Sequence, residues 1–106
     1  MPIDWNRKHR IDRKKGEQMV RAHQMGRKGS PEEPFGHAFS WAALEAIRAA
    51  NPDSKGIRFY HAVNDDGLPT LVGMALDASG EPTGVTALDY SQPCPPNCTS
   101  IWPPQG

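Results

Sequence analysis

The spacing of apolar residues predicts two helices in the first half of the chain. Apolar positions repeat at helical spacing over residues 12–25, and a second such run begins at Ser40, a good N-cap residue. Asn51-Pro52 ends the second run, because the residue before a proline avoids helical backbone angles. The apolar stripe of this second helix consists of Trp41, Leu44, Ile47 and five alanines.

Two-residue alternation of apolar and polar positions predicts three strands, at residues 57–63, 70–77 and 84–90. Residues 64–67 read Asn-Asp-Asp-Gly, a hairpin signal, because Asp-Gly supplies the positive φ that a tight turn requires. A second turn at residues 77–80 joins the next two strands. We therefore expect an α+β fold with two N-terminal helices packed on a three-stranded antiparallel β-meander and a Pro-rich C-terminal tail.

Tight turns would also fix which side chains share a face of the meander. In that case Ile57, Phe59 and Val63 lie on the helix-covered face with Val72, Met74, Leu76, Val85 and Ala87. The other face then carries Arg58, Tyr60, Leu71, Ala75, Leu88 and Tyr90. That second face is apolar for a surface in water, and three strands leave open edges. The pattern predicts a protein partner or an oligomer that covers the sheet.

The composition predicts one domain with flanking segments. The chain has 106 residues, of which 37% are hydrophobic, so a modest core is expected. We expect a basic N-terminal arm at residues 1–11, a single α+β domain at 12–90 and a Pro-rich, Cys-containing tail at 91–106. Because no apolar run reaches the length of a signal-peptide core or a membrane span, we expect a cytoplasmic location.

The charges divide the chain into a basic and an acidic part. Residues 1–28 carry nine Lys or Arg and three Asp or Glu, and the remaining residues carry three and nine. The basic part could meet an acidic protein surface, a nucleic acid or a membrane face, or the acidic part of its own chain or of another copy. Cations beside an aromatic ring also suit phosphate contact with base stacking. The residues concerned are Trp5, Arg7, Lys8, Arg10, Arg13, Lys14 and Lys15.

Cys94 and Cys98 enclose Pro-Pro-Asn, a spacing that differs from thioredoxin-like redox sites. A zinc site would need two more ligands, for which His37 and His61 are the plausible donors. A disulfide or redox switch and a structural turn with buried thiols are the alternatives. No cofactor is expected otherwise, and a cytoplasmic location predicts free thiols.

Catalysis is not expected from this sequence. A thiolate of Cys94 or Cys98 beside His61 would be a nucleophile, but a strand histidine is more often a partly buried structural residue. The chain contains no Gly-rich phosphate loop, serine elbow or paired-carboxylate motif.

The C-terminal tail adds a short apolar motif, Ile101-Trp102-Pro103-Pro104. Pro-rich segments dock well in aromatic grooves, since they are ordered before binding. The same motif could instead fold back over the sheet face that carries Tyr60 and Tyr90. The leading hypothesis is thus a protein-binding or assembly module. A metal or thiol-redox protein and a nucleic-acid binder are the alternatives.

Five motifs also stand in order along the chain, at residues 56–60 (GIRFY), 66–67 (DG), 70–73 (TLVG), 77–80 (DASG) and 92–98 (QPCPPNC). With two preceding helices and the Cys-Pro-Pro-x-Cys tail, this order resembles a group of small bacterial proteins of uncharacterised activity, encountered mostly in Bacteroidota-type genomes. The resemblance covers residues from about 12 to 100. It implies the helix, helix, hairpin architecture and assigns no activity.

Overall fold

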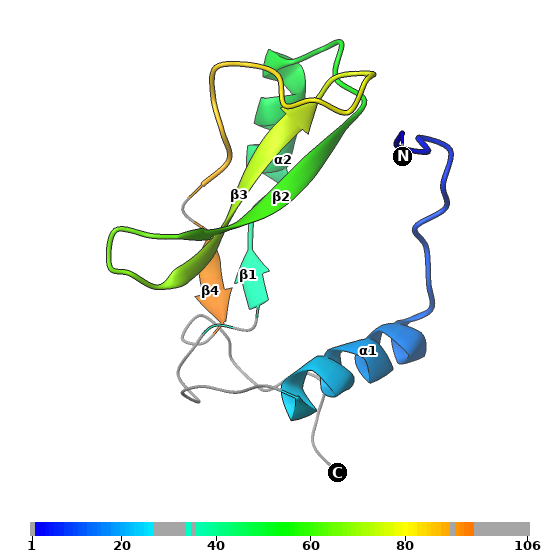
Figure 1. Ribbon diagram of the computed structural model, residues 1–106, viewed down its shortest axis with the longest axis vertical. Coiled ribbons are helices and arrows are strands. Elements are labelled where there is room, and N and C mark those ends of the chain that lie inside the picture. Colours follow the sequence, from blue (N-terminus) through cyan, green and yellow to red (C-terminus); the bar gives the residue numbers. More distant parts are fainter. Residues whose placement is uncertain (1, 27–33, 35, 90, 95–106) are drawn as a thin grey trace.

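The structure is a computed structural model that describes residues 2–26, 34, 36–89 and 91–94. Its elements in chain order are α1 (Arg13–Met25), β1 (Gly36–Ala38), α2 (Trp41–Ala50), β2 (Gly56–Val63), β3 (Pro69–Leu76) and β4 (Gln92–Cys94) (Figure 1). The strands form two antiparallel pairs, β1 with β4 and β2 with β3. The predicted α+β class, with two helices and antiparallel strands, is confirmed.

The strands β2 and β3 form the hairpin that the Asp-Gly signal predicts. Asn64 organises the connection, because its side-chain Oδ1 accepts the backbone N–H groups of Asp66 and Leu68 at 2.9 and 3.0 Å. Gly67 has a φ of 78°, a conformation that glycine adopts at little cost. The hairpin is therefore encoded locally by its turn residues.

The hairpin register differs from the predicted one. The connection spans residues 64–68, an odd number of positions, so that Ile57 lies opposite Ala75 and Tyr60 lies opposite Val72. The prediction that Ile57 shares a face with Val72 is wrong, because a one-residue change in register moves a strand's side chains to the other face. One face carries Ile57, Phe59, His61, Val63, Leu71, Gly73 and Ala75, and the other carries Arg58, Tyr60, Ala62, Thr70, Val72, Met74 and Leu76.

The predicted third strand of the meander does not form among the described residues. Two isolated antiparallel bridges form along β3 instead, from Gly73 to Leu88 within the predicted strand and from Leu76 to Pro82 before it. More residues separate Pro82 from Leu88 than separate Gly73 from Leu76, so a regular ladder cannot continue between the bridges. The chain departs from β3 at Gly84, which has a φ of 93°. The three-stranded meander is therefore wrong, and two two-stranded sheets take its place.

The second sheet joins a segment just before the second helix to the start of the predicted tail. Gly36–Ala38 pairs with Gln92–Cys94, and His37 lies opposite Pro93. The first residues of the predicted tail thus form a strand, which pairs with β1 and not with the hairpin. A two-stranded pair tolerates Pro93, since each of its strands has an outer edge that needs no hydrogen-bond donor.

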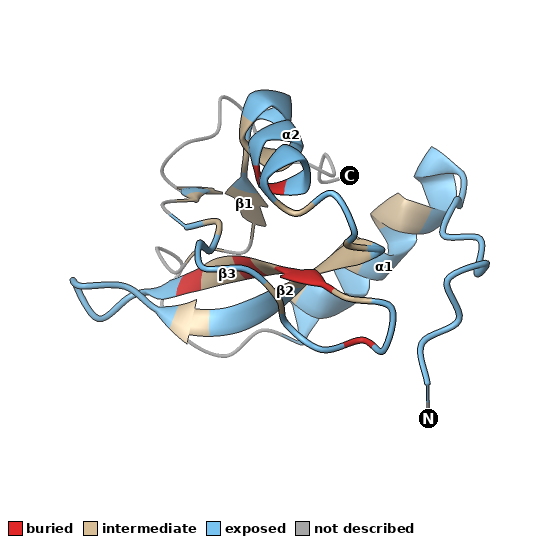
Figure 2. Ribbon diagram, turned by 90° about the horizontal axis from the view of Figure 1, so that it is seen from above, coloured by how far each residue is buried: buried red, intermediate tan, exposed pale blue. Residues whose placement is uncertain are grey.

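The buried apolar residues lie on α2 and on β3 (Figure 2). Ser40 begins α2 as predicted, because its Oγ accepts the backbone N–H of Ala43 at 3.0 Å. Among the described residues, the buried apolar side chains are Ile47, Ala75 and Leu76. This core is small, as the low hydrophobic content predicts.

Helix α1 lies apart from the hairpin (Figure 1), and none of its residues is buried. The carboxylate of Asp12 caps it by accepting the backbone N–H of Lys15 at 2.8 Å. The prediction that both helices pack on one sheet is therefore wrong, because of the two helices only α2 lies on the hairpin in the described part of the chain. No helix in the described part of the chain is long and apolar enough to cross a membrane.

Candidate partner-binding groove

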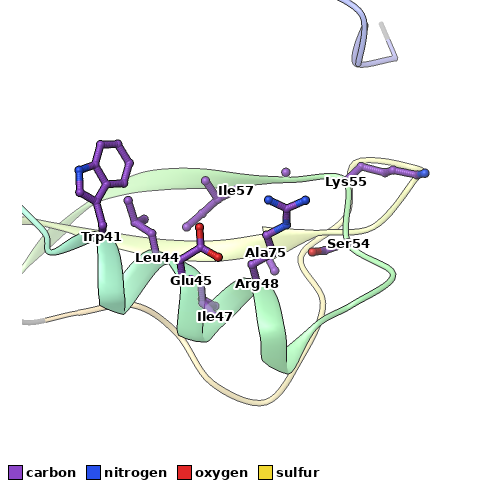
Figure 3. Close-up of a pocket in the computed structure, with 10 residues that line it drawn as sticks. Trp41, Leu44, Glu45, Ile47, Arg48, Ser54, Lys55, Ile57 and Ala75 are labelled. Carbon is purple, nitrogen blue, oxygen red and sulfur yellow. The ribbon is translucent and has the colours of Figure 1, made fainter.

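A groove of about 420 Å³ lies between α2 and the hairpin strands. Its volume is within the range of roughly 300–1,000 Å³ that is typical of binding sites. The residues that line it are Trp41, Leu44, Glu45, Ile47, Arg48, Ser54, Lys55, Gly56, Ile57 and Ala75 (Figure 3).

Helical spacing and strand pairing together shape this groove. Trp41, Leu44 and Arg48 are three or four residues apart, so they lie on one face of α2. Ile57 and Ala75, which lie opposite each other on β2 and β3, form the floor. Alanine at that position leaves space beneath the helix that a larger side chain would fill. The groove is therefore built from regular secondary structure.

The rim of the groove combines an exposed aromatic ring with charges. Trp41 is 81% exposed, although tryptophan is a largely buried residue in most proteins. It stands at one end of the groove and Lys55 at the other, with Glu45 and Arg48 between them (Figure 3). Such a surface can take apolar side chains on its floor while the charges orient a polar backbone or side chain.

Sequence reasoning missed these residues as a site. Trp41, Leu44 and Ile47 form the stripe that the pattern assigns to helix packing, and of the three only Ile47 is buried. The available signal was the presence of Glu45 and Arg48 at the same helical spacing, since a stripe interrupted by charges is seldom fully covered.

The predicted arm residues lie partly against their own chain. Trp5 donates its Nε1–H to the carbonyl of Ala78 at 3.1 Å. Its ring lies against Gly56, where a Cβ would be only 2.8 Å from Trp5 Cζ3. Trp5 as a whole is 37% exposed, so its own chain covers part of the residue. The cations Arg7, Lys8, Arg10, Arg13, Lys14 and Lys15 are all exposed.

The predicted sheet-face residues form a local pair. Arg58 donates from Nη1 to Tyr60 Oη at 3.2 Å, and its guanidinium lies 5.8 Å from the centroid of that ring. This places a cation over an aromatic face, an arrangement that stabilises both side chains modestly. Tyr90, Trp102 and Pro103 lie outside the described residues.

Three of the four predicted metal ligands, His37, His61 and Cys94, lie within the described residues, and they do not form a metal site there. His37 and His61 lie close enough for their charges to interact. The side chain of Cys94 shares a side of its sheet with Gly36, whose Cβ position is 3.8 Å away, so His37 points to the opposite side. Cys98 lies outside the described residues. No group of three or more His, Cys, Asp or Glu side chains suited to a metal occurs in the described part.

Cys94 is disulfide-bonded. The expectation of a free thiol at this position is therefore wrong, and the disulfide alternative fits the structure. Cytosolic proteins rarely keep such bonds, because the glutathione and thioredoxin systems reduce them.

A chain of polar groups connects the two sheets. His37 Nδ1 on β1 lies 3.0 Å from Ser91 Oγ, which in turn lies 3.0 Å from Thr70 Oγ1 on β3. Thr70 is buried, and this hydroxyl contact satisfies its side chain. Burial lowers the pKa of His37, and the charge of His61 lowers it further. The fold therefore favours the neutral imidazole.

This shift predicts that acidification destabilises the protein. A histidine whose pKa is lowered by folding contributes stability that is present above its ordinary value of 6.5 and is lost as the pH falls below it. Thermal unfolding followed by circular dichroism should give a lower Tm at about pH 5.5 than at about pH 7.5. The His37→Gln variant should show a weaker dependence, and the control His23→Gln on exposed α1 should match wild type. Equal slopes in all three proteins would refute this role of His37.

The chain was also compared with known proteins. Searches against protein-family models, curated proteins and solved structures found no match.

Proposed function

We propose that this chain is a small protein-binding module that holds a segment of another protein in the groove between α2 and the β2–β3 hairpin. The observation that carries the proposal is Trp41, whose indole is 81% exposed beside an apolar floor. Tryptophan is enriched among the residues that dominate binding energy at protein interfaces. The proposal follows the sequence pattern, which favours a binding module over an enzyme.

The energy available at Trp41 is large enough to matter for affinity. A tryptophan side chain buries roughly 150–250 Å² when covered, and apolar burial contributes about 25 cal/mol per Å². Ordering of the partner offsets part of this gain. We therefore expect that Trp41 contributes at least about 2 kcal/mol to binding, which is roughly 30-fold in Kd.

The charges on the rim indicate which side chains the expected partner segment carries. Glu45 and Arg48 stand on α2, and Lys55 stands at the far end of the groove. A partner segment with apolar side chains toward the floor and charges of both signs at its edges would complement this arrangement. Rim charges of this kind set orientation and association rate more than affinity.

Comparative capture from cell lysate tests the proposal. Immobilised wild type, Trp41→Ala and the control Met25→Ala are loaded equally, and bound proteins are quantified by mass spectrometry. Met25 is 88% exposed on α1, so its variant matches Trp41→Ala in exposure while leaving the groove intact. We expect at least one protein that wild type and Met25→Ala retain and Trp41→Ala loses, with a Kd weakened about 30-fold in a purified titration.

Both variants should keep the wild-type Tm, because neither side chain is buried. Identical capture by all three proteins would contradict the groove as a binding site. Loss of capture together with a lowered Tm would indicate a folding defect, and Trp41→Phe then separates the two effects, since it preserves an aromatic ring at the rim.

A further inference from the structure

We propose that the partner segment in the groove is an extended, acidic strand that pairs with the open edge of β2. The inference rests on the proposed function and adds to it the conformation and the charge of the segment. We define the open edge as the backbone N–H and C=O groups of Ile57, Phe59, His61 and Val63.

The hydrogen bonds of the hairpin decide which backbone groups of β2 point outward. Asn64 donates its N–H to the carbonyl of Leu68 at 2.9 Å, directly after β2. Because hydrogen-bonded pairs recur every two residues in an antiparallel ladder, the even-numbered residues of β2 bond to β3. The odd-numbered residues then point their N–H and C=O groups away from β3. Pro69 fits this phase, since it lies opposite Val63, where no N–H is needed.

The two edges of the hairpin differ in what covers them. On the outer side of β3, Gly73 and Leu88 exchange two backbone hydrogen bonds at 2.8 and 2.7 Å. Among the described residues β2 pairs with β3 alone, and in Figure 1 no strand lies on the other side of β2. No hydrogen bond in that part of the chain reaches the open edge. The edge of β3 is therefore occupied, whereas that of β2 is available.

The open edge also lacks the features that block pairing in other proteins. Edge strands are commonly protected by short length, proline, lysine or a bulge. Strand β2 has eight residues with neither proline nor lysine, and its one-to-one register with β3 leaves no bulge. Phe59 and Val63 are 39% and 70% exposed, so an added strand can reach this edge. Extended peptides bind such edges through backbone hydrogen bonds.

The groove receives the side chains of a strand that is added at this edge. Neighbouring strands lie about 4.8 Å apart, and successive side chains point to opposite faces of the sheet. Every second side chain of the segment therefore faces the same side as Ile57, which forms the groove floor with Ala75. Trp41 and Leu44 on α2 line that side (Figure 3). One segment can thus use the open edge and the groove together.

The charges around the groove favour an acidic segment. Arg48 and Lys55 outnumber Glu45, and within the described residues none of the three forms an ion pair. Strand β2 adds Arg58 and His61 and contains no carboxylate. A second copy fits this edge poorly, because two paired β2 strands would bring the arginines of both copies together. Asp or Glu residues on a strand of a different protein complement these cations.

Hydrogen exchange of the free protein, measured by NMR, tests whether the edge is open. After correction for intrinsic rates, the amides of Phe59 and His61 should exchange at least about tenfold faster than those of Arg58 and Tyr60, which bond to β3. Equal protection of all four amides would show that the edge is already paired and would overturn the proposal.

Selected peptides test strand pairing. Random peptides of about ten residues, the length of a long strand, are selected on wild type and depleted of those that bind Trp41→Ala. The enriched peptides should contain more Asp and Glu than the library. One of them is then N-methylated at one residue at a time. Methylation at every second residue should weaken Kd at least about tenfold, because it removes a donor to β2, and the residues between should change Kd less than about threefold.

The outcomes separate this inference from the proposed function. A peptide that needs Trp41 but shows no two-residue alternation on methylation would overturn strand pairing and leave the groove as a binding site. A selection without any peptide that needs Trp41 would overturn both. Wild type that sediments as a dimer which the selected peptides do not dissociate would assign the edge to a second copy and overturn the proposal.

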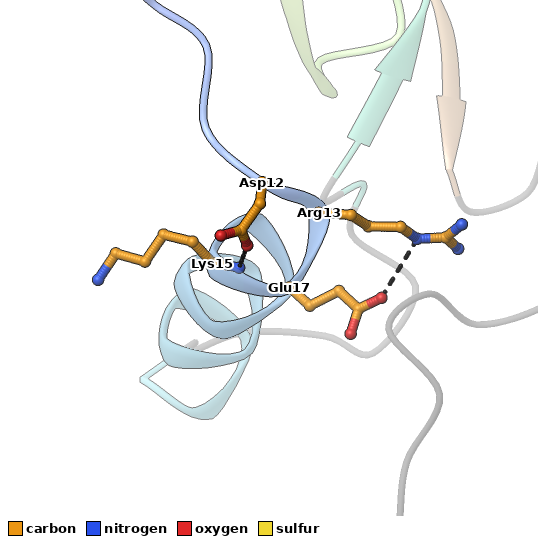
Figure 4. A network of polar contacts seen from close by, with 4 residues as sticks. All are labelled: Asp12, Arg13, Lys15 and Glu17. Carbon is orange, nitrogen blue, oxygen red and sulfur yellow. Dashed lines mark hydrogen bonds and ion pairs between the residues drawn. The ribbon is translucent and has the colours of Figure 1, made fainter.

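Charge reversal tests the acidic character of the segment. The variant Arg48→Glu with Lys55→Glu should slow association of the selected peptide at least about tenfold, measured by surface plasmon resonance. The control, Lys14→Glu with Lys15→Glu, should match wild type. It lies on α1, whose first turns are held by the Asp12 cap and by the ion pair from Arg13 to Glu17 (Figure 4). Equal association rates for both variants would contradict an acidic segment.

Discussion

Replacing Leu76 by alanine is expected to lower the free energy of unfolding by about 3 kcal/mol or more. Leu76 is 3% exposed and is one of three buried apolar residues in the described part of the chain, with Ile47 and Ala75. Removing its side chain leaves a cavity in a core that has few other contacts to compensate. Thermal unfolding followed by circular dichroism should show a Tm lowered by more than about 10 °C.

Val85→Ala is the matched control, because the Val85 side chain is fully exposed. It should change the free energy of unfolding by less than about 0.5 kcal/mol. If Leu76→Ala and Val85→Ala unfold at the same temperature, the buried side chain of Leu76 does not help to hold the fold together.

Replacing Gly84 by alanine is expected to cost more than the same change at Gly67. Both glycines have positive φ, 93° and 78°, so alanine is strained at either position by about 1 kcal/mol or more. At Gly67 a Cβ meets nothing within 4 Å, whereas at Gly84 it would collide with Asn51 Oδ1. To make room, Asn51 must give up the hydrogen bond that its Nδ2 donates to the carbonyl of Ile47 at 2.9 Å.

The expected loss of stability is therefore about 1 kcal/mol for Gly67→Ala and about 2–3 kcal/mol for Gly84→Ala. Urea unfolding of the two variants measures the difference directly. Both variants strain the backbone in the same way. The difference between their free energies of unfolding therefore measures the contact between Gly84 and Asn51, the residue at the end of α2. Equal midpoints for the two variants would show that this contact contributes nothing to stability.

The elements that the sequence predicts well are those encoded by neighbouring residues. Asp12 and Ser40 cap the helices through backbone groups three residues away. The hairpin turn depends on Asn64 and Gly67, which are both within the turn itself. Such local interactions can be predicted from a single sequence, because they do not depend on how the remaining chain folds.

The register of the hairpin, in contrast, does not follow from its turn residues. The sequence marks the turn but not its length, and the bonds from Asn64 Oδ1 widen the connection to an odd number of residues. This one position decides whether Ile57 shares a face of the hairpin with Ala75 or with Val72. The face assignment depended entirely on it.

Long-range pairing was the other failure. The β1–β4 sheet joins Gly36–Ala38 to Gln92–Cys94, segments that are short, far apart in sequence and bordered by prolines. Strands of three residues are too short to show an alternation of apolar and polar positions, so the sequence pattern does not predict this pairing. The groove was also not predicted, because it depends on how α2 is oriented on the hairpin. Ile47 is buried there, whereas Trp41 on the same helix stays exposed.

The groove is the central claim, and site-specific photo-crosslinking in intact cells tests it most directly. A photoreactive benzophenone residue is placed at position 41 in one variant and at the fully exposed position 85 in another. The benzophenone keeps an aromatic ring where Trp41 stands, so binding should survive. A protein adduct that forms on irradiation from position 41 and not from position 85 is the predicted result. Adducts of equal yield from both positions, or from position 85 alone, would contradict a partner seated in the groove.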